Sequence, residues 1–137
     1  VLQPTSPFRG GNILRAAVEM LARRADVDSI VAMTAMDLFA DKIFFANEDG
    51  CAAPVNQYTR RPVYQPNGAL YLTRSHRLRE EGTLYAGKIL PCVSDPIRGL
   101  DIDTVEDWRL AEALLASGLP PERNSFSAEP PSTERPL

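Results

Sequence analysis

The chain has 137 residues, of which 44% are hydrophobic and 24% are charged, and its formal net charge is −3. This length allows one domain with a real core, and the acidic balance argues against a general nucleic-acid binder, which presents a basic face. No apolar run approaches the ~20 residues that a membrane helix needs, so we expect no membrane partner. Cys51 and Cys92 lack metal-ligand spacing and are expected to be reduced thiols, which fits a cytoplasmic location.

The N-terminal part of the chain has the pattern of an α/β protein. Val1 and Leu2 have the character of the end of a buried strand, and the Pro-Thr-Ser-Pro sequence after them predicts a rigid turn. Asn12 is a candidate cap for a helix over residues 13–24, and residues 29–34 then have the character of a buried strand. Strand, helix and strand in this order predict a right-handed crossover and a parallel sheet. The apolar face of the helix is formed by Ile13, Leu14, Ala17, Val18 and Leu21.

The middle of the chain alternates between apolar segments and turns. Residues 42–46 and about 51–55 flank an Asn-Glu-Asp-Gly turn and predict a hairpin. Residues 69–73 form a further strand, residues 74–81 a short surface helix, and residues 89–93 an apolar segment interrupted by a proline.

The last regular elements precede a change in composition. Residues 100–103 are expected to be extended, and Thr104 caps a helix over about residues 105–117, with an acid three residues later that imitates a capping box. We take residues 1–118 as one domain and the Pro-rich residues 119–137 as a disordered tail. The buried stripe of the helix is expected to be Val105, Trp108, Ala111, Leu114 and Leu115.

The sharpest chemical signal is a pair of aspartates. On a strand, Asp101 and Asp103 share one face with their Cα atoms ~7 Å apart, while Ile102 points into the core. Mg²⁺ takes one or two protein carboxylates and completes its shell with phosphate and water, so this pair suits that ion. The alternative is that both aspartates are solvated and one helps to cap the next helix.

Two turns and one cation are weaker candidates. Gln3 and the hydroxyls after it could bind a polyhydroxylated ligand at the carboxyl end of a strand, or the turn is only structural. Asn67 and Gly68 permit a positive φ and the close approach of a ligand, or they form a plain tight turn. Lys42 is either an anion contact or a solvated strand end. His76 is the one histidine and lies in a charged surface segment, which argues against a histidine-based triad.

Three motifs in this order, LQPTSPFR, PNGALYL and DIDTVEDW, resemble the cytidylyltransferases that activate sialic acid and related acidic sugars. The resemblance covers about residues 1–116 and implies a partial three-layer nucleotidyltransferase (Rossmann-like) α/β sheet with a projecting dimerisation hairpin. Such enzymes join CTP to the anomeric hydroxyl of a nonulosonic sugar with Mg²⁺, forming a CMP-sugar and pyrophosphate. The resemblance therefore implies a homodimer or higher homo-oligomer, and an acidic sugar or nucleotide as ligand.

The resemblance also implies roles for single residues. The substrate-binding residues would be Gln3, Lys42, Asn67, Gly68 and Tyr85, and the metal ligands would be Asp101 and Asp103. Tyr85 falls where one subunit of the family lends a residue to the site of the other. This chain has Gln65 where the family has arginine, and a second family arginine falls at Gln57 or shifts to Arg60. A charged hydrogen bond is worth about 1.5–3 kcal/mol, so these changes predict weaker binding of an anionic substrate.

The CTP-binding segment of the family comes before the Gln-Pro-Thr-Ser-Pro turn and has no counterpart in this sequence. The resemblance therefore predicts a truncated cytidylyltransferase-like domain that does not release pyrophosphate by itself. The alternative is a non-catalytic dimeric module that binds a ligand or partner through the same fold. Without the N-terminal strands and helices of the family, a sheet edge and apolar faces would be exposed, which predicts self-association in both cases.

Overall fold

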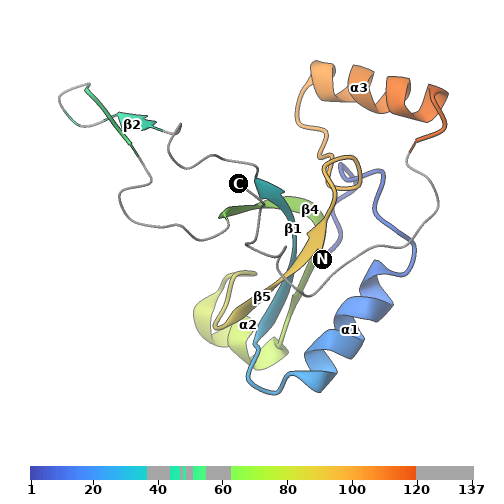
Figure 1. Ribbon diagram of the computed structural model, residues 1–137. Coiled ribbons are helices and arrows are strands. Elements are labelled where there is room, and N and C mark those ends of the chain that lie inside the picture. The colour runs from blue at the N-terminus through green and yellow to red at the C-terminus, as the bar shows by residue number, and fades with distance from the viewer. Residues whose placement is uncertain (37–43, 47, 49–50, 55–62, 120–137) are drawn as a thin grey trace, which may run out of the picture.

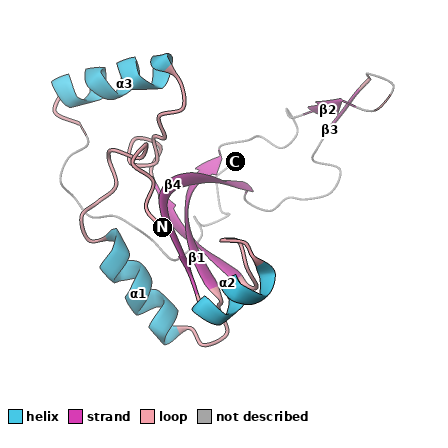
Figure 2. Cartoon of the chain, turned by 180° about the vertical axis from the view of Figure 1, so that it is seen from behind, coloured by secondary structure: helices cyan, strands magenta, loops and turns pink. Residues whose placement is uncertain are grey.

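The chain folds into an α/β arrangement of helices and strands. The computed structural model describes residues 1–36, 44–46, 48, 51–54 and 63–119. In order, the elements are α1 (Ile13–Arg23), β1 (Ser29–Met36), β2 (Phe44–Ala46), β3 (Ala52–Pro54), β4 (Val63–Thr73), α2 (Ser75–Glu81), β5 (Ile89–Ser94) and α3 (Val105–Ala116). Figure 1 and Figure 2 show these elements from opposite sides. The predicted α/β class is confirmed.

The central sheet has three strands in the order β4-β1-β5. Ser29 of β1 lies opposite Ile89 of the parallel strand β5 and opposite Thr73 of the antiparallel strand β4. The sheet is therefore mixed, and the prediction of a parallel sheet is wrong for β4. The parallel neighbours β1 and β5 need a crossover connection, usually through a helix, and α2 lies between them in the chain. The antiparallel neighbours β1 and β4 need no such helix, and no described residue between them is helical.

The first residues run along the outer edge of β4. Val1 and Tyr71 exchange two backbone hydrogen bonds of 2.7 and 2.9 Å, and the Gln3 amide donates to the Gly68 carbonyl at 3.1 Å. The prediction of a buried strand end is wrong, because Val1 and Leu2 are 66% and 44% exposed. Their backbone is paired while their side chains lie at the edge of the sheet. This pairing places Gln3 beside β4.

Helix α1 packs on β1 and β4 and covers them with only part of its apolar face. Ile13 and Ala17 are buried as predicted, but Leu14 and Val18 are exposed, because the apolar arc is wider than the surface that the sheet offers. Asn12 occupies the cap position, yet its side chain makes no capping bond in the described structure. The predicted helix is confirmed with an end one residue earlier.

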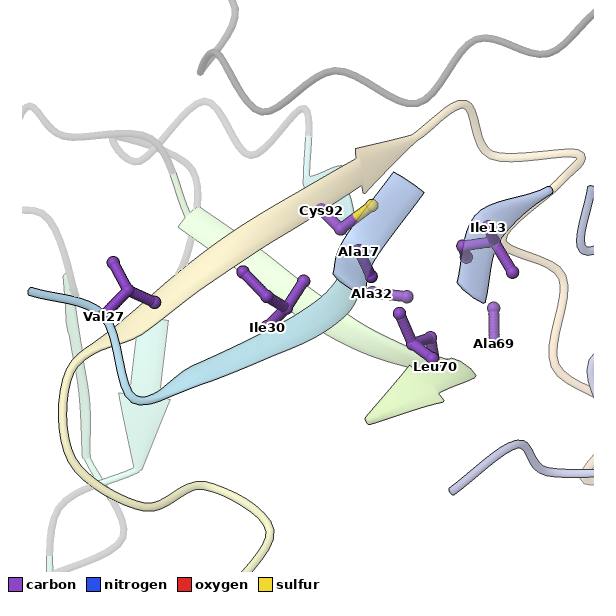
Figure 3. Packing of buried hydrophobic residues seen from close by; sticks show 8 residues of the cluster. All are labelled: Ile13, Ala17, Val27, Ile30, Ala32, Ala69, Leu70 and Cys92. Atoms are coloured by element: carbon purple, nitrogen blue, oxygen red, sulfur yellow. The ribbon is translucent and has the colours of Figure 1, made fainter. Parts of the chain in front are cut away.

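The main core lies between α1 and the three strands of the central sheet (Figure 3). Its buried members are Ile13, Ala17, Val27, Ile30, Ala32, Ala69, Leu70 and Cys92. Burial raises the pKa of the Cys92 thiol to about 11, so this thiol stays protonated at neutral pH. Cys92 and the exposed Cys51 are not joined in a disulfide, as expected for reduced thiols.

Strands β2 and β3 form a separate antiparallel pair. Phe44 lies opposite Pro54 and Ala46 lies opposite Ala52, which confirms the predicted hairpin for its described residues. In both overall views the pair lies apart from the central sheet. The role of this hairpin in dimerisation, and self-association in general, stay predictions.

Helix α3 begins at a capping box and lies beyond the end of the sheet (Figure 1). Thr104 accepts a hydrogen bond from the Asp107 amide at 3.2 Å, and its own amide donates to the Asp107 carboxylate at 2.8 Å. The Thr104 hydroxyl also donates to the same carboxylate at 2.7 Å, and this bond, with that of the Thr104 amide, lowers the pKa of Asp107. The predicted stripe is largely wrong, because only Ala111 of its five residues is buried. Val105, Trp108 and Leu115 are exposed.

Two further predictions concern the Pro-rich tail and helices that could span a membrane. Residues 120–137, which include almost all of the predicted tail, lie outside the described residues. Within the described part of the chain, no helix has the length and apolar character needed to cross a membrane.

Asp28 joins three elements at the start of β1. Its carboxylate accepts hydrogen bonds from the Lys88 amide at 2.9 Å and from the Arg77 guanidinium of α2 at 3.1 Å. Gly87 approaches so closely, with φ +60°, that a side chain there would overlap this carboxylate. The Lys88 amide and Arg77 stabilise the charged form and lower the pKa of Asp28 below 3.8.

Acid should therefore remove a stabilising contribution at this position. The contribution of Asp28 is complete above its unfolded-state pKa of 3.8 and is lost as the pH falls through that value toward the lower folded-state pKa. We expect Asp28→Asn to lower the melting temperature most at neutral pH, with the gap to wild type narrowing below about pH 4. Thermal scans from pH 7 to about pH 3 measure this gap. Glu19→Gln, at an exposed position of α1, is the control. A gap that stays constant with pH would contradict the assignment.

Candidate functional site

The PNG motif forms a bulge in the middle of β4. Ala32 of β1 faces four residues of β4, at 67–70, where regular pairing would give it one. Gly68 within this bulge has φ +72°, which confirms the positive φ that the sequence permits there. Asn67 is only 3% exposed, and its side-chain amide donates to the hydroxyls of Thr34 at 3.1 Å and Ser94 at 2.9 Å. The bulge is thus tied to both β1 and β5.

Three segments that are far apart in the sequence meet at Gly68. A methyl group on Gly68 would overlap the amide oxygen of Gln3. It would also lie 2.7 Å from the Ser6 hydroxyl and 2.9 Å from the Asp101 carboxylate. Only glycine leaves room for these polar atoms. We define the Gly68 cluster as Gln3, Ser6, Gly68, Tyr71 and Asp101.

Hydrogen bonds hold the three segments of the cluster together. The Ser6 hydroxyl donates to the Asn67 carbonyl at 2.9 Å, and the Asp101 carboxylate lies 3.5 Å from the same hydroxyl. The Ile102 amide donates to the Thr5 carbonyl at 2.9 Å, which fixes the segment that carries Asp101 against the opening turn. The cluster is therefore built by the fold and does not depend on neighbours in the sequence.

Two tyrosines extend the cluster toward solvent. The rings of Tyr71 and Tyr85 meet edge to face, with centroids 5.7 Å apart. Burial, then the bond to Tyr85 and the charge of Asp101, raise the pKa of Tyr71 to about 12. The buried Tyr71 hydroxyl thus remains a hydrogen-bond donor at neutral pH. Tyr85 is 47% exposed and is the cluster's solvent-facing neighbour.

The two aspartates do not lie on a strand, so the prediction of a shared strand face is wrong. Residues 101–103 have no regular structure, and the Ile102 amide is used by the opening turn. Asp101 is half-buried in the cluster, whereas Asp103 is exposed next to α3 and its amide donates to Asp107 at 3.2 Å. The bond to the turn replaces the strand pairing that the pattern suggested.

A comparison with curated proteins bears on this site. The chain is similar to CMP-N,N'-diacetyllegionaminic acid synthase of Legionella pneumophila, with 27% identity over 135 residues. The alignment covers 84% of this chain and 52% of that protein. The chain resembles a nonulosonic acid cytidylyltransferase. It carries a cytidylyltransferase-like domain that spans about half the length of this relative. No family model matches the chain.

The cytidylyltransferase-like domain brings together several of the residues that the motifs single out. Gln3, Gly68 and Asp101 meet, and Tyr85 joins them through Tyr71. Lys42 lies outside the described residues. Their roles in binding stay predictions, as do those of Asn67 and Asp103.

The domain also places Tyr71 and Arg9 at the site, which the sequence predictions did not assign to it, and it confirms that the Ser6 hydroxyl lies there. Ser6 and Tyr71 lie inside quoted motifs, but nothing in the pattern shows that their side chains converge on Asp101. Arg9 ends the first motif and donates to the Ala69 carbonyl at 3.4 Å, which places a cation beside the bulge. Gln65, where the resemblance leads us to expect arginine, is exposed on β4.

Asp101 and Asp103 carry the type of side chain that Mg²⁺ prefers, and their role as a pair of metal ligands stays a prediction. Asp101 and Asp103 supply two hard carboxylates, one half-buried and one exposed, and Mg²⁺ binds through one or two such groups. Among the described residues no group of three acidic, histidine or cysteine side chains could hold a metal by itself. Phosphate oxygens and water would complete the shell, as this ion prefers.

Proposed function

We propose that this chain is the sugar- and metal-binding part of a nonulosonic acid cytidylyltransferase of the three-layer nucleotidyltransferase type. Such an enzyme transfers CMP from CTP to an acidic nonulosonic sugar and releases pyrophosphate. The observation that carries the proposal is the meeting of Gln3, Gly68 and Asp101, each from a different motif, in a chain similar to a CMP-N,N'-diacetyllegionaminic acid synthase.

The polar groups of the Gly68 cluster suit a hydroxylated, acidic ligand. The Gln3 amide has both donor and acceptor atoms, and the Tyr71 hydroxyl stays protonated well above neutral pH. Gly68 leaves the room that the polar groups of Gln3, Ser6 and Asp101 occupy. These groups would bind and orient the sugar, while Asp101 and Asp103 would hold Mg²⁺. When bound, the ion would neutralise charge on the phosphate groups.

Asp101→Asn is expected to weaken sugar binding in the presence of Mg²⁺. The substitution keeps the size of the side chain but removes the charge that a divalent cation needs. We expect the dissociation constant for N,N'-diacetyllegionaminic acid to rise about tenfold or more. We also expect Mg²⁺ to tighten binding to wild type but not to the variant. Isothermal titration calorimetry with and without Mg²⁺ measures both effects.

A matched control separates this result from a general change of charge. Glu106→Gln removes one carboxylate from the exposed first turn of α3, outside the Gly68 cluster, and should bind as wild type does. Equal affinities of wild type and Asp101→Asn would sink the metal assignment. A wild-type chain that fails to bind the sugar with Mg²⁺ would overturn the proposed function itself.

A further inference from the structure

Asn67 lies at the centre of a polar network beneath the Gly68 cluster. Its side-chain amide donates both hydrogens within the protein, at 3.1 Å to Thr34 and 2.9 Å to Ser94. Its side-chain oxygen accepts the Ala69 amide at 3.3 Å. Since Asn67 is also 3% exposed, little of it is available to a ligand. We infer that Asn67, Thr34 and Ser94 are positioning residues that hold the Gly68 cluster in place without touching its ligand.

The network reaches the segment that carries Asp101. Gly99 packs so closely against it that a methyl group there would overlap the Thr34 hydroxyl and lie 2.8 Å from the Asn67 amide nitrogen. Ser94 ends β5, five residues before Gly99. The distance from Gly99 to Asp101 is two residues, so the network sets where the chain enters the cluster.

The network also reaches the opening turn. The backbone carbonyl of Asn67 accepts the Ser6 hydroxyl at 2.9 Å, while its side chain binds β1 and β5. One residue therefore fixes the opening turn, the bulge and the Asp101 segment relative to one another. The Thr34 hydroxyl is the acceptor from β1 that keeps the amide in this orientation.

This role differs from the direct substrate contact that the sequence resemblance implies for Asn67. If Asn67 touched the sugar, its partners Thr34 and Ser94 would matter little to the cluster. If it positions the cluster, removing a partner should loosen the segment that carries Asp101 and weaken the binding of the ligand. The effect on a ligand rests on the proposed function, whereas the effect on the segment does not.

The test removes the acceptor and keeps the shape of the side chain. Thr34→Val is isosteric but cannot accept the Asn67 amide, and Thr34→Ser restores the hydroxyl. We measure hydrogen exchange of the Ile102 amide, which bonds to the Thr5 carbonyl, against the Arg74 amide, which bonds to the Asp28 carbonyl at the other end of the sheet. We expect Ile102 to exchange about tenfold faster in Thr34→Val, with Arg74 unchanged and Thr34→Ser like wild type. Ser94→Ala is the second variant, should Thr34→Val not fold.

Thr73→Val is the matched control. Thr73 also lies on the sheet, three residues beyond the bulge, and its hydroxyl donates to the Leu84 carbonyl at 2.8 Å and accepts from Ser29 at 3.2 Å. Its substitution should leave Ile102 exchange as in wild type. An unchanged Ile102 rate in both Thr34→Val and Ser94→Ala overturns the inference.

Sugar affinity supplies the readout that a merely structural role would not move. With Mg²⁺ and N,N'-diacetyllegionaminic acid, we expect Thr34→Val to raise the dissociation constant about fivefold and Thr34→Ser to restore it. Faster Ile102 exchange with unchanged sugar affinity overturns the positioning role. If wild type binds no sugar, the proposed function fails, and the exchange rates alone decide whether the network holds the Asp101 segment.

Discussion

Gly68→Ala is expected to lower the free energy of unfolding by about 3 kcal/mol and to abolish ligand binding at the Gly68 cluster. Two costs add. The backbone has φ +72°, which an L-residue with a side chain adopts at a cost of about 1–2 kcal/mol. The new methyl group would also overlap the Gln3 amide and crowd the Ser6 hydroxyl and the Asp101 carboxylate. Urea unfolding followed by far-ultraviolet circular dichroism measures the change in stability.

The chain offers a control that isolates the first of these costs. Gly82 has φ +66° at the end of α2, but a side chain there would meet no atom within 4 Å. Gly82→Ala should therefore cost only about 1 kcal/mol. The difference between the two variants measures how tightly Gln3, Ser6 and Asp101 pack around Gly68. Equal losses would show that the bulge is not crowded.

Arg74→Ala is expected to lower the free energy of unfolding by about 2 kcal/mol. The guanidinium of Arg74 donates to the carbonyls of Val27 at 2.9 Å, Leu21 at 3.0 Å and Arg24 at 3.3 Å. It thereby satisfies carbonyls at the end of α1 and places a positive charge at the negative end of the helix dipole. Its removal separates α1 from the chain that follows β4. Chemical denaturation of the variant measures the loss.

Two further variants distinguish geometry from charge. Arg74→Lys keeps the charge, but its ammonium group cannot reach all three carbonyls as the planar guanidinium does. The stability of this variant should therefore fall between those of wild type and Arg74→Ala. Arg79→Ala removes a neighbouring arginine whose contact, at 3.4 Å to Ser75, stays within α2, and should cost less than about 0.5 kcal/mol. If Arg79→Ala costs as much as Arg74→Ala, the capping role of Arg74 is wrong.

Local features of the fold could be predicted from the sequence because a few neighbouring residues decide them. The Thr104 and Asp107 capping box depends on a three-residue spacing, and the positive φ of Gly68 follows from its missing side chain. The antiparallel pairing of β2 with β3, two segments close together in the sequence, is of the same kind. In each case the physical cause lies within one turn of the chain.

Burial and strand pairing could not be predicted in this way, because they depend on distant partners. The apolar residues of α3 match a buried stripe, yet Trp108 is exposed, since α3 lies beyond the end of the central sheet. The direction of β4 depends on its connection to β1, which periodicity does not reveal. Likewise, no spacing shows that Arg74 reaches across to α1.

The candidate site was predictable as a set of motifs but not as a constellation. Gln3, Gly68 and Asp101 each stand out by residue type and local turn chemistry. Their meeting depends on the β4 bulge and on the bond between Ile102 and Thr5, which the sequence does not encode in any local pattern. Ser6 and Tyr71 contribute through the same convergence.

The exposure of α3 has a practical consequence for spectroscopy. Trp108 is the single tryptophan of the chain and is 56% exposed on a helix that lies beyond the end of the sheet. We therefore expect its fluorescence in the native protein to lie close to that of a solvated indole and to change little on global unfolding. The same emission is well suited to another purpose, because a molecule that covers α3 will shift it toward shorter wavelengths. We therefore expect tryptophan fluorescence to report the binding of a molecule to α3 and to be nearly insensitive to unfolding of the core.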